Sequence, residues 1–237
     1  MEITPETTIA RIAADLPATI RVFQRHHLDF CCGAGIPLRE VCAREDLDLG
    51  GLIAELEAVT TCAGDSDNWQ DAPLPDLVAH IQARYHRHLY EELPRLSAMM
   101  TKVLQRHGDR LPRTLPPLAA VFDFLQQDLL HHMRREDAVL FPAILSLPTG
   151  LGEPGDTARL AATIEVMERD HARVGDALEH LRVLTNGYQP PDDACPTFRG
   201  LYFGLAELEK DMHVHVHLEN HILFPRALSP AAGQIAP

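Results

Sequence analysis

One pattern occurs twice in this chain, in residues 128–142 and again in residues 211–225. Each copy reads Asp-x3-His-x3-Glu-x3-Leu-Phe-Pro, and the matched residues are Asp128, His132 and Glu136 in the first copy and Asp211, His215 and Glu219 in the second. Residues four apart lie on the same face of an α-helix, so each copy directs two carboxylates and an imidazole the same way. Two such helices facing a common core make a metal site, because iron, manganese and zinc accept histidine nitrogen and carboxylate oxygen.

Composition limits the classes of protein that this chain can belong to. Its 237 residues, 46% of them hydrophobic, are enough to bury a core in one large or two small domains. The net charge of −13, with 21 scattered lysines and arginines, argues against a nucleic-acid partner. We expect no membrane partner, because the sequence has no run of roughly 18 to 20 apolar residues.

Five cysteines, including the adjacent pair Cys31 and Cys32, do not resemble a secreted disulfide framework. The first residues also lack the basic and apolar regions of a signal peptide. We therefore expect a cytoplasmic protein with reduced thiols.

Turn-forming residues divide the sequence into domains. Residues 1–62 have helical apolar spacing, interrupted by a glycine- and proline-containing turn at 29–37 and resuming from Leu38 to Val59. A polar, breaker-rich linker is expected at 63–75, a larger domain at 76–230 and a tail at 231–237.

The larger domain contains four long segments of helical periodicity and no strand-like alternation. They cover about residues 77–107, 116–146, 156–186 and 195–228, and the second should bend or end near Pro142. The expected fold is all-α, an up-and-down four-helix bundle preceded by a small helical N-terminal domain.

Neighbours at helical spacing indicate which histidines of the bundle face its core. His86 shares a face with apolar residues such as Ala79, Ala83 and Leu93, and His171 lies in a similar setting, whereas His88 and His217 turn away. One such histidine alone is more often a hydrogen-bonded core residue than a ligand. The duplicated pattern favours metal, and the predicted ligands are His86, His132, Glu136, His171, His215 and Glu219.

Four imidazoles and two carboxylates suit two ions, each bound by two histidines and both bridged by the glutamates. Coordination would also remove the cost of burying two carboxylates. Asp128 and Asp211, one turn before their histidines, are the candidates for orienting the imidazoles.

Cys31 and Cys32 are candidate reactive thiols. Backbone amides of their turn and a helix beginning near Leu38 would lower a thiol pKa, leaving thiolate available to accept iron, react with a nitrosyl or form a vicinal disulfide. Cys42, Cys62 and Cys195 are expected to pack as small apolar residues.

These motifs resemble the family of iron–sulfur cluster repair di-iron proteins, also called repair-of-iron-centres proteins. The resemblance lies in Asp-Phe-Cys-Cys-Gly at 29–33, Arg-Tyr-His at 84–86, His-Met-x-x-Glu at 132–136, Glu-x-Asp-His at 168–171 and His-x3-Glu-Asn-x3-Phe-Pro-Arg-Ala at 215–227. The sequence departs from the family in having Cys-Cys-Gly-Ala-Gly where Cys-Cys-Gly-Gly is usual.

The resemblance implies a hemerythrin-like bundle with a non-haem di-iron centre, oxo- and carboxylate-bridged, on the same six residues. It also implies a stress protein that repairs iron–sulfur clusters damaged by nitric oxide or oxidants, by delivering iron to damaged iron–sulfur proteins.

Two alternatives remain open. The first is a di-iron enzyme that reduces nitric oxide or activates oxygen, with either gas as a small ligand. The second is an oxygen carrier, against which stand the thiol-bearing domain and the five-histidine pattern of true hemerythrins. The sequence does not decide between iron donation and turnover.

Overall fold

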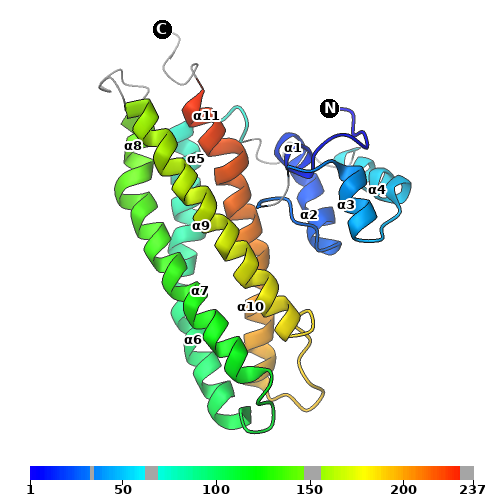
Figure 1. Ribbon diagram of the computed structural model, residues 1–237, viewed down its shortest axis with the longest axis vertical. Helices are drawn as coiled ribbons and strands as arrows, with labels where there is room; N and C mark the ends of the chain where they lie inside the picture. Colours follow the sequence, from blue (N-terminus) through cyan, green and yellow to red (C-terminus); the bar gives the residue numbers. More distant parts are fainter. Residues whose placement is uncertain (33–34, 62–68, 147–155, 230–237) are drawn as a thin grey trace. The chain divides into compact units, whose positions relative to one another are not determined.

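The computed structural model describes residues 1–32, 35–61, 69–146 and 156–229 (Figure 1). These residues are mainly helical and form no strand, although one isolated antiparallel bridge joins Thr8 and Pro37. The all-α prediction is therefore confirmed. None of the helices in these ranges is long and apolar enough to cross a membrane.

Backbone contacts divide the chain into two compact units. Among the described residues, the first contains 1–32, 35–61, 69–79 and 213–229, and the second contains 80–146 and 156–212. The domain boundaries expected from the sequence remain a prediction.

The N-terminal part of the first unit consists of short helices around an apolar core. They are α1 (Ile9–Asp15), the 3₁₀ turn Pro17–Thr19, α2 (Ile20–Arg25), α3 (Leu38–Arg44) and α4 (Leu49–Thr61). Thr8 begins α1, its side chain accepting a hydrogen bond from the Arg11 amide. Phe23 and Phe30 are fully buried and stack with centroids 6.1 Å apart.

The helical pattern predicted from Leu38 to Val59 is broken in the structure. Helix α3 ends at Arg44, and Asp46 adopts a positive φ of 53°. Asp48 then accepts a hydrogen bond from the Gly51 amide at 2.9 Å, as a residue that starts a helix does. Asp46 and Asp48 thus separate helices α3 and α4, although the apolar spacing in the sequence runs through both.

The C-terminal part of the first unit packs against this core. It contains the end of α10 (Pro196–Leu218), the π-helical turn Glu219–Leu223 and α11 (Phe224–Leu228). Val214 packs against the N-terminal core, and the Arg226 guanidinium donates to the carbonyls of Trp69 and Ala72 at 2.7 and 2.5 Å. Of the predicted linker, residues 63–68 lie outside the described ranges, as does Cys62. The predicted tail, 231–237, also lies outside them.

The second unit is built mainly from long helices. They are α6 (Arg87–His107), α7 (Leu115–Arg135), α9 (Asp156–Leu184) and most of α10, and the short helix α8 (Phe141–Ser146) accompanies them. Helix α7 packs against both α6 and α9 (Figure 1). A Cβ at Gly204 would lie 2.5 Å from Leu96 Cδ2, so this glycine lets α10 approach α6 closely.

Candidate metal centre

Three π-helical turns interrupt the long helices at candidate ligands. They are Gln82–His86, between α5 (Leu74–Ile81) and α6, then Glu136–Leu140 and Glu219–Leu223. His86 ends the first turn, and Glu136 and Glu219 begin the other two. A π-turn inserts an extra residue and rotates the chain before it relative to the chain after it, and such turns are frequent at functional sites. The sequence predicts a bend or an end near Pro142. In the structure Pro142 lies just after the second π-turn, and helix α8 continues past it to Ser146.

Glu136 is fully buried and faces three imidazoles with its two oxygens. Its Oε1 lies 2.9 Å from His132 Nε2 and 3.8 Å from His171 Nε2, while Oε2 lies 3.4 Å from His86 Nε2. Each oxygen thus faces a different side of the cluster. A carboxylate placed this way is suited to bridge two cations.

The protonation state of Glu136 follows from the same neighbours. Burial alone would raise the pKa of its carboxyl group, but His132, His171 and His86 outweigh that effect and hold the pKa well below its usual range. The residue is an anion that is removed from water. Among the described residues, neither oxygen has a hydrogen-bond partner of good geometry. Such a carboxylate fits a bound cation, which would satisfy both oxygens.

His132 and His171 meet at their Nε2 atoms. The two nitrogens are 2.9 Å apart, and the ring centroids are 4.6 Å apart. Without a metal ion, a hydrogen bond between the two nitrogens requires that one carries the proton and the other accepts it. Both nitrogens lie on the same side of Glu136, where they are placed to act as two ligands of a single cation.

Asp137 orients the His86 imidazole from behind. His86 Nδ1 donates to Asp137 Oδ1 at 2.9 Å, which leaves Nε2 to face Glu136. A carboxylate that accepts from the far ring nitrogen in this way fixes the tautomer and the ring orientation of a ligating histidine. Asp170 lies behind His132, but its Oδ2 is 3.7 Å from His132 Nδ1, beyond hydrogen-bond distance, and its carboxylate pairs with Arg135 and Arg173.

The prediction that Asp128 and Asp211 would orient the imidazoles is wrong. Asp128 Oδ1 accepts from Arg173 at 3.3 Å, and Asp211 pairs with Arg84 at 3.1 Å. The acids near these imidazoles instead come from other segments, Asp137 from the π-helical turn after α7 and Asp170 from α9. The sequence could have indicated these acids, because each is adjacent to a predicted ligand: Asp137 follows Glu136 and Asp170 precedes His171.

The remaining two predicted ligands are on α10 and the turn that follows it. His215 Nε2 lies 3.1 Å from Glu219 Oε1, and both side chains are buried. Among the described residues, two groups of histidines and glutamates could hold a metal ion, with the ligand atoms of each group within 4.8 Å of one another. They are His86, Glu136, His215 and Glu219, and His132, Glu136, His171 and Glu219. Both glutamates belong to both groups.

His88 and His217 belong to neither group. The His88 side chain is 48% exposed, near Asp211. His217 is buried, and its Nδ1 donates to the Phe30 carbonyl at 3.1 Å. Burial lowers the pKa of His217 to about 4, with a further contribution from His221, so the ring is neutral.

The thiol pair lies in the first unit. Cys31 Sγ is 3.4 Å from Cys32 Sγ, and Cys31 is buried while Cys32 is partly exposed. The predicted lowering of the thiol pKa is wrong for Cys31. A hydrogen bond with Cys32 and burial raise its pKa well above the usual value, and the negative charge of Asp29 adds to this. Gly33 of the expected turn lies outside the described residues.

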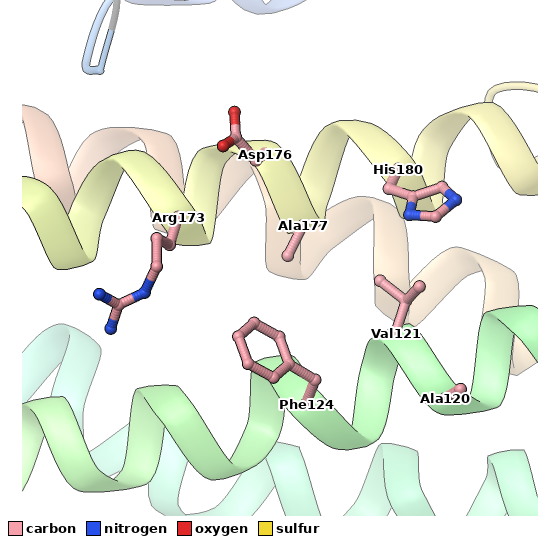
Figure 2. A pocket seen from close by; sticks show the side chains of 7 residues that line it. All are labelled: Ala120, Val121, Phe124, Arg173, Asp176, Ala177 and His180. Carbon is pink, nitrogen blue, oxygen red and sulfur yellow. The ribbon is translucent and has the colours of Figure 1, made fainter.

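A separate hollow of about 450 Å³ lies between α7 and α9 (Figure 2). It is lined by Ala120, Val121, Phe124, Arg173, Asp176, Ala177 and His180. None of the six predicted ligands lines it, so it is distinct from the cluster around Glu136.

Comparison with known proteins agrees with this fold and cluster. Residues 77–227 match the hemerythrin HHE cation binding domain, and the chain belongs to this family, within its branch of iron–sulfur cluster repair proteins. Residues 5–60 match ScdA_N, a domain of unknown function.

Three relatives illustrate the similarity. The iron–sulfur cluster repair protein YtfE of Edwardsiella ictaluri is 40% identical over 222 residues, which cover 93% of this chain and 96% of that protein. The YtfE proteins of Yersinia pseudotuberculosis and Yersinia pestis are 38% identical over 221 residues, with the same coverage.

Proposed function

We propose that this protein repairs iron–sulfur clusters damaged by nitric oxide or oxidants, and that it does so by delivering iron. The observation that carries the proposal is the pair of buried histidine–glutamate groups sharing Glu136 and Glu219. The relatives that match nearly the whole chain are iron–sulfur cluster repair proteins by name, which supports the repair activity.

The six ligands would hold two iron ions as cargo. Imidazole nitrogen and carboxylate oxygen suit iron, and no thiolate belongs to either group. Asp137 keeps the His86 imidazole oriented, and the apolar helices around the ligands exclude water. Iron held in this way would be protected until a client protein needs it.

The thiol pair is the candidate for passing iron on. Asn220 and His221 directly follow the proposed ligand Glu219, and both contact the Cys31 carbonyl, at 3.3 and 2.8 Å. The thiol-bearing turn is thus tied to the segment that bears Glu219. Cys31, Cys32, Cys42 and Cys195 are all free, which suits a cytoplasmic protein with reduced thiols.

The test is a repair assay with a purified cluster enzyme inactivated by nitric oxide. Adding the iron-loaded protein should restore enzyme activity while iron leaves the protein in proportion. The same protein exposed to nitric oxide alone should retain its iron and form no reduced gas product. Gas turnover without enzyme recovery would favour the di-iron enzyme and refute the proposal.

A cysteine variant tests the thiol step in the same assay. The double variant Cys31→Ser/Cys32→Ser should keep its iron and its helical content but lose most of the repair activity. Cys42→Ser, which removes a buried thiol from the same unit, should repair like the parent. Equal repair by the double variant and the parent would show that the thiols are structural.

A further inference from the structure

A third group of metal-ligating atoms lies outside the histidine–glutamate cluster. Asp29, Cys31 and Cys32 bring a carboxylate oxygen and two sulfurs within 4.8 Å of one another. Cys31 Sγ is 3.4 Å from Cys32 Sγ and 3.2 Å from Asp29 Oδ1. Two sulfurs and one oxygen form a softer donor set than imidazole and carboxylate.

These separations are close to those that a tetrahedral ion imposes. Zinc bound at about 2.3 Å to sulfur and 2.0–2.2 Å to oxygen holds its ligand atoms roughly 3.5–3.8 Å apart. The observed spacings are shorter by only a few tenths of an ångström. Small side-chain rotations would therefore be enough to admit an ion.

The backbone of this turn is fixed on two sides. Asp29 Oδ1 accepts from the amides of Cys31 and Cys32, at 2.8 and 2.9 Å. On the other side, the Cys31 carbonyl accepts from His221 Nε2 at 2.8 Å and from Asn220 at 3.3 Å. Ligands on a backbone held this way keep their relative positions when the ion leaves, as a preorganised site requires.

The three ligands differ in solvent exposure, and this difference gives a metal ion a path from solvent to the site. Cys31 is buried, Cys32 is partly exposed and Asp29 is exposed. A cation can thus arrive from solvent and retain a water molecule as its fourth ligand. Three protein ligands with one open position are the arrangement of catalytic zinc sites, whereas structural zinc sites are closed by four protein ligands.

We propose that Asp29, Cys31 and Cys32 bind one thiophilic divalent cation of the first transition row, such as zinc or ferrous iron. On binding, two S–H bonds break, two metal–sulfur bonds form, both protons pass to solvent and no electron is transferred. This site deepens the proposed function by giving its thiol step a third ligand, Asp29, and for that role it rests on the proposed function. Metal binding at the three residues is measured separately from cluster repair.

The test uses the iron-loaded full chain, kept reduced with a phosphine, and one equivalent of Zn²⁺. X-ray absorption at the zinc edge is blind to the iron. We expect two sulfur neighbours at about 2.3 Å and oxygen at about 2.0–2.2 Å, with the iron content unchanged. Zinc bound only through nitrogen and oxygen, or no bound zinc, would overturn the proposal.

Variants assign the ligands. Cys31→Ser and Cys32→Ser should each lose one sulfur neighbour, whereas Cys42→Ser should match the parent. Asp29→Asn retains an oxygen that can accept the two backbone amides, so the turn should persist while zinc affinity falls by roughly tenfold or more. Asp15→Asn, which removes a surface charge from the same unit, serves as the control. Unchanged zinc affinity in Asp29→Asn would exclude the three-residue site. The zinc measurements do not depend on the repair assay, so a failure of repair would leave this proposal standing.

Discussion

At the scale of single residues, Glu136 has the environment that is hardest to satisfy without a cation. It is an anion with no exposed surface, and its close neighbours are imidazole nitrogens on two sides. Burying a carboxylate without full compensation costs several kcal/mol. A metal ion on each side of the carboxylate would remove that cost.

Variants of His86 and His88 test which histidines are metal ligands. His86→Ala should lower the iron content, because its Nε2 faces Glu136 inside the cluster. His88→Ala should leave the iron content unchanged, because its side chain is 48% exposed and belongs to neither metal group. Iron analysis of the purified variants measures both effects. Equal losses would mean that the assignment of helix faces is mistaken.

Asp137→Asn tests the orientation of an imidazole. The amide cannot stabilise the His86 Nδ1–H as a carboxylate does, so metal affinity should fall by roughly 10- to 100-fold with no change in helical content. Chelator competition measures the affinity. Asp123→Asn, on the exposed surface of α7, is the matched control, and an identical response of the two variants would refute the orienting role.

At the scale of elements, the π-turns decide how far helical periodicity predicts the structure. His132 and His215 lie in α-helix that continues up to Glu136 and Glu219. Residues four apart therefore share a face, and each histidine contacts its glutamate as predicted. The turn at Gln82–His86 shifts the face before it. Val78 and Ile81 are buried there, whereas Ala79 and Ala83, which periodicity had placed beside His86, are exposed.

Other features could not be predicted from spacing along one helix. The contacts from Asp137 to His86 and from Asp170 to His132 join different helices, and sequence separation does not reveal which helices pair. The hydrogen bonds from Asn220 and His221 to the Cys31 carbonyl likewise join segments that are distant in the sequence. The fold class, in contrast, followed from periodicity alone.

Phe30 lies in the core of the N-terminal helices. Phe30 is fully buried and contacts Phe23 and His217, so Phe30→Ala should destabilise the first unit by about 3–5 kcal/mol. Phe124→Ala should have a much smaller effect, because that ring is 53% exposed. Denaturant unfolding followed by circular dichroism compares them, and similar losses would contradict the assigned core.

At the scale of the whole molecule, folding and metal binding should be coupled. Ligands on separate helices come together only in the folded chain, so a cation that binds the native state stabilises it by mass action. Removing iron with a chelator should therefore lower the melting temperature, and restoring iron should recover it. A melting temperature unchanged by chelation would show that the core does not depend on metal.

The central claim is that two ions share the buried glutamates, and the iron content of Glu136→Ala beside the parent tests it most directly. The parent should carry about two iron atoms, one for each group of ligands. Because Glu136 belongs to both groups, its removal should disturb both ions together and change the iron spectrum. A Glu136→Ala protein that retains two ions with an unchanged spectrum would contradict the shared site.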